Sequence, residues 1–150
     1  MQTLTDDRAH LAEIDSMDLP TLISGHRSAL VLLADRPEPP RGTTAPGDLV
    51  YLRTASGQVV AAGRVERVDA FDHLTNHDLR LLRESHGART IGTGSAWSSK
   101  PDARFATVVW LGDVRPVVQS SGVPSALLST PKQAWRSIEP VENTQSRRAA

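Results

Sequence analysis

Residues 49–70, LVYLRTASGQVVAAGRVERVDA, decide the class of fold. Residues 49–54 are mostly apolar, β-branched or aromatic, which is typical of a strand. Ser56-Gly57 is a tight-turn signal. Residues 58–70 predict a long second strand, with Gly63 at a bulge or bend. Because strands joined by a tight turn pair in opposite directions, this stretch predicts an antiparallel hairpin.

Apolar stretches on either side of this hairpin predict further buried strands. Residues 28–34, SALVLLA, are bounded by polar residues, and residues 105–111 are apolar on both faces. Gly112-Asp113 predicts a turn into another strand over residues 114–119. Residues 37–47 contain four prolines and two glycines, which predicts a loop. About five strands are therefore expected.

Two helices are predicted by the residues at their ends. Asp18 and Pro20 are typical of a helix start, and Gly25 is typical of its end. A second helix begins at Thr75, which is followed three residues later by a carboxylate, and stops at Gly87. Both helices are short, and they are expected to plug the ends of a small barrel.

The chain ends give weaker patterns. Residues 131–138, PKQAWRSI, predict a last helix, and residues 1–15 predict a short helix or a loose arm. Strands and helices do not alternate regularly, which argues against a parallel doubly wound sheet. We therefore predict an α+β, mainly β fold: a small, partly closed antiparallel β-barrel of about five strands with two or three short helices.

The composition suits one domain, since the chain has 150 residues and a mass of 16.2 kDa. We expect this domain over residues 18–139, between an acidic N-terminal arm at residues 1–17 and a frayed tail at residues 140–150. Cysteine is absent, which excludes disulfides and thiolate metal sites. No apolar run approaches roughly 18 residues, and the first ten residues lack the pattern of a secretory signal. These features predict a cytoplasmic protein without membrane association.

The net charge is zero, with 17 basic and 17 acidic residues, so strong non-specific binding to nucleic acid is not expected. A local basic groove is still compatible with this balance. Fifteen of the bases are arginine. Arginine suits forked contacts to phosphate groups or base edges, although a GC-rich genome also encodes it more often.

Gly25-His26-Arg27-Ser28 lies at a predicted helix-to-strand junction, and Arg36 follows the far end of that strand. Glycine at a junction allows the backbone to turn and to approach a ligand closely. A hydroxyl and two guanidinium groups nearby would suit a phosphate or a base edge. Alternatively, Gly25 only ends the helix and the polar residues that follow it lie at the surface.

The polar loop at residues 87–104 contains Trp97, Lys100 and Arg104. Trp97 lies among serines and glycines, and its ring would offer a stacking face for a base, with the two cations on a phosphate. Alternatively, Trp97 folds back as a lid on the core. The other two tryptophans are expected to pack inside the fold: Trp110 and Trp135.

Metal and nucleotide motifs are weak. His73 and His77 are four residues apart, but they lack the glutamate of the zincin motif. Gly92-Thr93-Gly94 fits neither a dinucleotide fingerprint nor a P-loop, and no Gly-x-Ser-x-Gly elbow is present. We therefore expect no metal and no cofactor.

Taken in order, these features resemble the ASCH domain family of the PUA-like superfamily of small β-barrels. The family's Gly-x-Lys-Thr motif corresponds to Gly25-His26-Arg27-Ser28, and its later Gly-Asp corresponds to Gly47-Asp48. The resemblance covers about residues 19–119. The related EVE and YTH domains share the superfamily. These short motifs do not distinguish an ASCH domain from an EVE or YTH domain.

The resemblance implies a cleft that accepts RNA, a nucleotide or a modified base. Some ASCH-like proteins are hydrolases of acylated cytidine or RNA, in which the motif lysine, its threonine and a later glutamate are the working groups. Arg27 replaces that lysine here, and arginine does not give up its proton. Ser28 keeps a hydroxyl, and Glu66 is the candidate acid, unless it pairs with Arg64 or Arg67 on the strand surface.

We therefore expect a module that binds RNA, a nucleotide or a modified base. Its two walls are predicted to consist of Gly25, Arg27, Ser28 and Arg36 on one side, and of Trp97, Lys100 and Arg104 on the other. Trp97 would stack on the base, as aromatic cages do in YTH and EVE domains. Two alternatives stay open: a small metal-independent hydrolase that uses Ser28 and Glu66, and a protein-interaction module whose acidic arm docks a basic partner.

Overall fold

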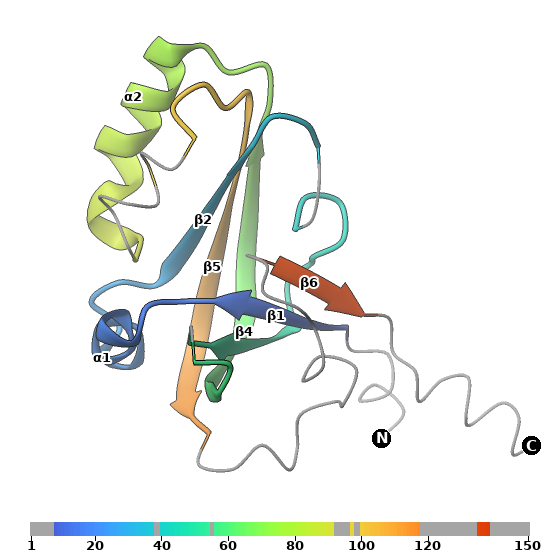
Figure 1. Ribbon diagram of the computed structural model, residues 1–150, viewed down its shortest axis with the longest axis vertical. Helices are drawn as coiled ribbons and strands as arrows, with labels where there is room; N and C mark the ends of the chain where they lie inside the picture. Colours follow the sequence, from blue (N-terminus) through green and yellow to red (C-terminus); the bar gives the residue numbers. More distant parts are fainter. Residues whose placement is uncertain are drawn as a thin grey trace, which may run out of the picture.

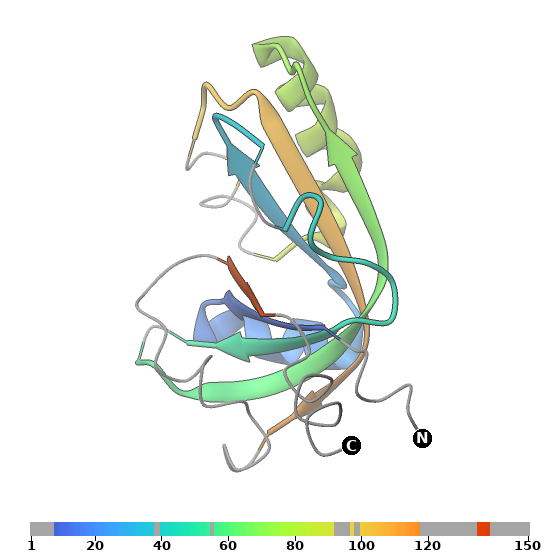
Figure 2. The same ribbon diagram turned by 90° about the vertical axis from the view of Figure 1, so that its right-hand side faces the viewer.

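The computed structural model describes residues 8–37, 40–54, 56–91, 97, 100–117 and 135–138. Within them, the centre of the fold is a six-stranded sheet in the order β2-β5-β4-β3-β1-β6. The sheet curls into a half-barrel that is open on one side (Figure 2). Strands β1 and β3 are parallel, and every other neighbouring pair is antiparallel. The expected mainly β, α+β class is confirmed, but the all-antiparallel, five-strand prediction is corrected to six strands with one parallel pair.

The hairpin expected from residues 49–70 is present. Strands β3 (Leu49–Arg53) and β4 (Val59–Phe71) pair antiparallel across Gly57, whose φ of 91° is a left-handed conformation that glycine adopts without strain. The register between β4 and β5 shifts at Gly63, where a Cβ atom would lie 2.9 Å from the Val114 side chain. The predicted bulge at Gly63 is therefore confirmed, and a larger residue would not fit there without displacing its neighbour.

Strands β2 (Ala29–Ala34) and β5 (Phe105–Pro116) form the buried antiparallel pair that the apolar stretches predict. The turn predicted at Gly112-Asp113 is wrong. Asp113 has a φ of 53°, and the chain forms a bulge opposite Gly63 before the same strand continues to its end. A single residue in the left-handed conformation changes the direction of a strand but does not turn the chain back. The separate strand predicted over residues 114–119 is thus the end of β5, and residues 118–119 lie outside the described part.

Both chain ends contribute strands where the sequence predicts helices. Strand β1 (Ala9–Glu13) lies between β3 and β6 (Trp135–Ile138), so both of its edges are hydrogen-bonded. The helix or loose arm predicted for residues 1–15 is wrong over β1, and the helix predicted for residues 131–138 is wrong over β6. Their other residues, 1–7 and 131–134, lie outside the described part. A helix of this length is only marginally stable alone. Pairing with neighbouring strands therefore decides that these two segments are extended.

The first helix agrees with the residues that predict it. α1 (Leu19–Ser24) follows a single 3-10 turn, η2 (Ser16–Asp18), and has Pro20 in its first turn. It ends at Gly25, whose φ of 84° gives the left-handed C-cap that favours glycine. This cap sends the chain directly into β2, and it therefore places the Gly-x-basic-hydroxyl motif beside the sheet.

The second helix, α2 (Asn76–His86), starts with a complete capping box. The Asp78 N–H donates to Thr75 Oγ1 at 3.1 Å, and the Thr75 N–H donates to the Asp78 carboxylate at 2.9 Å. The chain then continues through a 3-10 turn, η3 (Gly87–Arg89). In Figure 1, α2 lies beside the upper part of β2, β5 and β4, and Leu82 of this helix packs with Leu33 of β2 and Ala106 of β5 on one face of the sheet. It thus leaves the opposite face of these strands to form the inside of the half-barrel.

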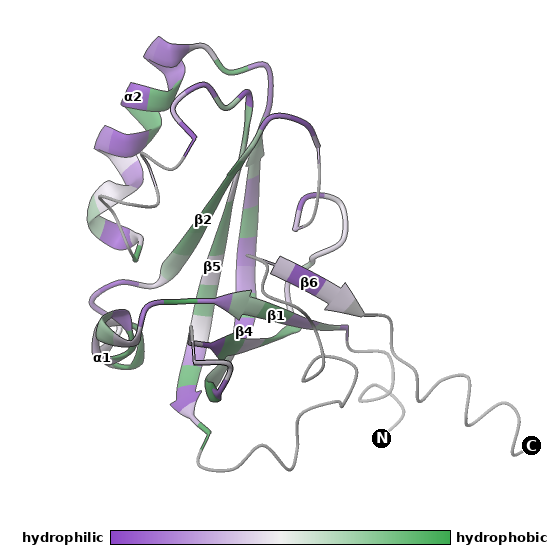
Figure 3. Ribbon diagram, viewed as in Figure 1, coloured by the Kyte–Doolittle hydropathy of each residue, from purple (hydrophilic) through white to green (hydrophobic). Residues whose placement is uncertain are grey.

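The buried residues form two main clusters, one on each face of the sheet. The cluster beneath α2 contains Leu33, Leu74, Leu82, Trp97, Ala103 and Ala106. The cluster inside the half-barrel includes Leu22, Leu30, Val50, Leu52, Val65, Val109 and Trp135. Figure 3 shows the resulting contrast between apolar strands β2 and β5 and the polar outer side of α2. Among the described residues, no helix is long and apolar enough to cross a membrane.

Candidate functional site

Arg27, the basic residue of the Gly-x-basic-hydroxyl motif, reaches across to the C-terminal end of α2. Its Nη1 donates to the Gly87 carbonyl at 3.2 Å and to the Thr90 carbonyl at 2.6 Å. The Arg27 backbone N–H donates to the Thr21 carbonyl of α1 at 3.1 Å. Arg27 therefore links the end of α1 to the distant segment at residues 87–90, and its partly buried guanidinium has a defined direction.

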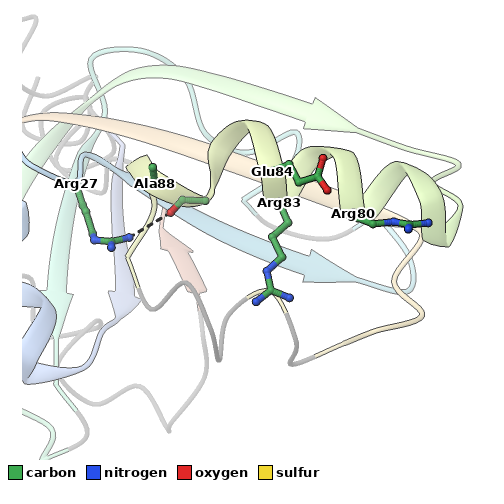
Figure 4. A pocket seen from close by; sticks show the side chains of 6 residues that line it. Arg27, Arg80, Arg83, Glu84 and Ala88 are labelled. Carbon is green, nitrogen blue, oxygen red and sulfur yellow. Dashed lines mark hydrogen bonds between the residues drawn. The ribbon is translucent and has the colours of Figure 1, made fainter.

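A hollow of about 500 Å³ opens beside Arg27. The residues that line it are Arg27, Arg80, Arg83, Glu84, Gly87 and Ala88 (Figure 4). Arg80 and Arg83 are three residues apart on α2, so their side chains leave the helix on neighbouring positions. Both are exposed, and Arg80 Nη2 lies 3.4 Å from His77 Nδ1. Three guanidinium groups against one carboxylate make this hollow suited to an anion.

Ser28 and Glu66, the pair expected to act in a hydrolase, are not brought together. The Ser28 backbone bonds to η3 and β5, since its N–H donates to the Arg89 carbonyl at 2.9 Å and its carbonyl accepts from Leu111 at 2.7 Å. Glu66 is exposed on β4, and its carboxylate lies against Gly112. Among the described residues, no hydrogen bond joins the two side chains. In the described part of the chain, Glu66 is therefore not placed to act as a base for the Ser28 hydroxyl.

Arg36, Lys100 and Arg104 lie at the opposite end of β2 from Arg27. The Arg104 N–H donates to the Ala34 carbonyl at 3.1 Å, and its guanidinium donates to the Asp102 carbonyl at 3.0 Å. A strand of this length separates its two ends by roughly 20 Å. The predicted wall of Arg27, Ser28 and Arg36 is therefore divided between the two ends of β2, whereas Lys100 and Arg104 lie at the same end as Arg36.

Trp97 is buried, with 6% of its surface exposed. It packs beneath α2 with Leu33 and Leu82, and its Nε1 donates to Thr90 Oγ1 at 3.1 Å. The ring is therefore a lid on the core, the alternative considered above, and the predicted stacking role is corrected. Trp97 still supports the site indirectly, because the Thr90 that it contacts also supplies the carbonyl that accepts from Arg27.

Trp110 is half-buried, although its apolar strand predicts a core position. Its Nε1 donates to Asp69 Oδ2 at 2.8 Å, and the Arg67 Cζ lies 4.8 Å from the centre of its ring. Arg89 and His86 flank the same ring at 6.0 and 5.9 Å. The prediction of a core tryptophan is corrected for a structural reason: α2 ends at His86 and does not cover this part of β5. One feature of the sequence could have indicated this exposed position. Arg67 and Asp69 are two residues apart on a predicted strand, so both lie on one face of it.

His10 lies in a buried hydrogen-bonded chain that the sequence analysis does not identify. Its Nε2 is 2.8 Å from Asp48 Oδ2, and its Nδ1 is 2.7 Å from Ser137 Oγ. This is the order of a Ser-His-Asp triad. However, His10 has no exposed surface, and Ser137 Oγ also accepts from Trp135 Nε1 and lies 3.2 Å from Thr43 Oγ1. This hydrogen-bonded chain ties β1 and β6 to the turn before β3.

The two histidines considered for metal binding are also separated by the helix start. His73 has a φ of 54° and precedes the Thr75 cap, whereas His77 lies within α2. In the part of the chain that the structure describes, no group of three or more histidine, aspartate or glutamate side chains is placed to hold a metal ion.

Comparison with known proteins identifies the fold. No family model matches the sequence, and no curated protein sequence matches it. The crystal structure of ASCH from Zymomonas mobilis matches with a TM-score of 0.62 at 14% identity, covering 94% of each chain. A serine-to-alanine variant of that protein matches with a TM-score of 0.64 at 14% identity, covering 95% of this chain and 97% of the other. The chain therefore has an ASCH-like fold, which confirms the resemblance at the level of structure.

Proposed function

From this ASCH-like fold, we propose that the protein is a PUA-like module that binds RNA or a nucleotide through phosphate groups in the hollow beside Arg27. The observation that carries the proposal is that Arg27, Arg80 and Arg83 all line one open hollow along α2 (Figure 4). Arg27 comes from the motif before β2, whereas the other two come from α2. Guanidinium groups bind phosphate oxygens in a forked geometry, and their charge does not depend on pH in the ordinary range.

The direction of Arg27 supports binding more than proton transfer. Two backbone carbonyls accept from its guanidinium and hold it at the rim of the hollow. A guanidinium offers only hydrogen-bond donors and no acceptor, so it stabilises an anion but does not act as a general base. The hydrolase alternative has less support, because Ser28 and Glu66 lack a mutual hydrogen bond within the described residues. A modified base has less support as well, because the Trp97 ring is enclosed.

Two exposed arginines allow a direct test. The double variant Arg80→Gln/Arg83→Gln removes two cations from the hollow without opening the core, since both side chains are exposed. We expect its affinity for a short RNA to fall about tenfold, and the slope of log affinity against log salt to fall by about 0.7 for each lost phosphate contact. Fluorescence anisotropy with a labelled oligouridylate measures both quantities.

The matched control removes two exposed cations elsewhere. Arg104→Gln/Arg115→Gln has the same change in net charge, but Arg104 lies at the far end of β2 and Arg115 pairs with Asp113 near the end of β5. We expect the control to bind within about twofold of the parent protein, because net charge alone has little effect at ordinary salt. Equal losses in the two double variants would mean that the hollow has no special role.

A further inference from the structure

A second cationic surface lies next to the hollow, around the half-buried ring of Trp110. Asp69 accepts from both Trp110 Nε1 and Arg67 Nε, at 2.8 and 3.1 Å, so one carboxylate orients the indole and the guanidinium together. The Arg67 Cζ then lies 4.8 Å from the ring centre, which is within the range of a cation–π contact. Arg89 flanks the same ring at 6.0 Å. We call Arg67, Arg89 and Trp110 the Trp110 platform.

The Trp110 platform and the hollow share one segment of chain. Gly87 lines the hollow and accepts from Arg27, and Arg89 of the platform follows it by two residues. From Arg80 to Arg89 the chain advances roughly 14 Å at the rise of a helix. Exposed arginines therefore lie on α2, on the 3-10 turn that follows it and on β4.

Resting on the proposed function, we propose that the ligand is a single-stranded RNA chain rather than a mononucleotide. Its phosphates lie in the hollow, and it passes over η3, with a base stacked on the Trp110 platform. A base stacks on the plane of a guanidinium as well as on an indole. Arg67 is already held over Trp110, so a base on its outer side extends an ordered stack. Arg89 is placed to meet the phosphate between the two sites.

The charges and the exposures around this path favour RNA over an apolar partner. Five arginines line the path: Arg27, Arg67, Arg80, Arg83 and Arg89. The carboxylates nearby are Asp69, which is bonded to Trp110 and Arg67, together with Glu66 and Glu84. The other two tryptophans are buried, with exposures of 6% for Trp97 and 5% for Trp135. Trp110 is thus the tryptophan that a base reaches.

This path makes affinity depend on the length and strandedness of the RNA. A mononucleotide fills only the hollow, whereas a longer strand also gains a stacked base on the platform. Stacking of this kind needs an unpaired base, since a duplex keeps its faces covered. The experiment is a series of oligouridylates, from the mononucleotide to about eight nucleotides, with a self-complementary duplex of similar length. Binding is measured by calorimetry and by quenching of tryptophan fluorescence.

The deciding variant is Arg67→Gln/Arg89→Gln, which changes two exposed side chains and leaves the hollow intact. We expect the parent protein to gain about tenfold or more in affinity between the mononucleotide and the longest strand, and the variant to lose most of that gain. Mononucleotide binding should be unchanged in the variant. The duplex should bind less tightly than the single strand of the same length.

A second measurement guards against an indirect effect of the double variant. Trp110→Phe keeps an aromatic ring on β5 and removes the reporting indole, so the RNA-induced quenching should disappear while the buried Trp97 and Trp135 continue to emit. Quenching that persists in Trp110→Phe would overturn the platform. Affinity that does not increase with RNA length would also overturn it, while leaving the proposed function intact. No binding of any member of the series would contradict the proposed function itself.

Discussion

Trp97 and Trp110 both lie near the C-terminal end of α2, yet their surroundings are opposite. Trp97 comes from a polar stretch of sequence, but it is enclosed beneath α2 and bonded to Thr90. Trp110 comes from the apolar strand β5, but its ring is half-exposed between Arg67, Arg89 and His86. The difference shows that the extent of the covering helix, and not the polarity of neighbouring residues, decides which tryptophan is available to a ligand.

The largest expected effect is on the free energy of unfolding, and it distinguishes the buried Trp97 from the half-exposed Trp110. Trp97→Ala removes a buried ring and should lower the free energy of unfolding by about 3–5 kcal/mol. Trp110→Ala removes a half-exposed ring and should cost about 1 kcal/mol. Urea unfolding followed by circular dichroism measures both. Equal losses would contradict the contrast between a core lid and a surface platform.

A smaller effect isolates the hydrogen bond of each indole. Thr90→Val removes the buried oxygen that accepts from Trp97 Nε1 and leaves that donor without water, so we expect a loss of about 1–3 kcal/mol. Asp69→Ala removes the acceptor of Trp110 Nε1, where water replaces it, and should cost about 0.5 kcal/mol. Thr90→Ser keeps the hydroxyl and is the control. If Thr90→Ser were as unstable as Thr90→Val, packing rather than the hydrogen bond would explain the loss.

The smallest effect concerns pH and the start of α2, the helix that covers Trp97 but not Trp110. The hydrogen bonds from the backbone and side chain of Thr75 lower the pKa of Asp78 from its ordinary value of 3.8. Because the folded pKa lies below the unfolded one, ionised Asp78 contributes its full stability above the unfolded pKa. That contribution is lost as the pH falls through the folded pKa.

The measurement is the urea midpoint at about pH 5 and at about pH 3, for the parent protein and for Asp78→Asn. We expect the parent protein to lose its advantage over the variant at the lower pH. Emission from Trp97 should report this change before emission from Trp110 does, since only the former lies beneath α2. If the difference in urea midpoint between the two proteins were the same at both pH values, ionisation of Asp78 would not explain it.

The parts of the fold that the sequence predicts correctly depend on few neighbouring residues. The turn at Ser56-Gly57 needs a glycine in the left-handed conformation, and Gly57 adopts this conformation. Thr75 and Asp78 satisfy each other's backbone groups within one helical turn. The part of the candidate site that the sequence predicts also depends on neighbouring residues only. It consists of the Gly25 cap and Arg27, which follows it. Arg80 and Arg83 gave no signal, because an exposed helix face has the same pattern whether or not a ligand binds it.

The sequence by itself determined the hairpin around Ser56-Gly57, the ends of α1 and α2, the apolar strand β2, and β5 as far as residue 111. These follow from backbone preferences and periodicity within a short segment. Only the tertiary structure decided that β1 pairs with β3, that Arg27 binds the chain at the C-terminal end of α2, and that Trp97 is buried while Trp110 is half-exposed. Each of these depends on contacts between residues far apart in the chain, and such contacts override local propensity because burial and strand pairing outweigh it.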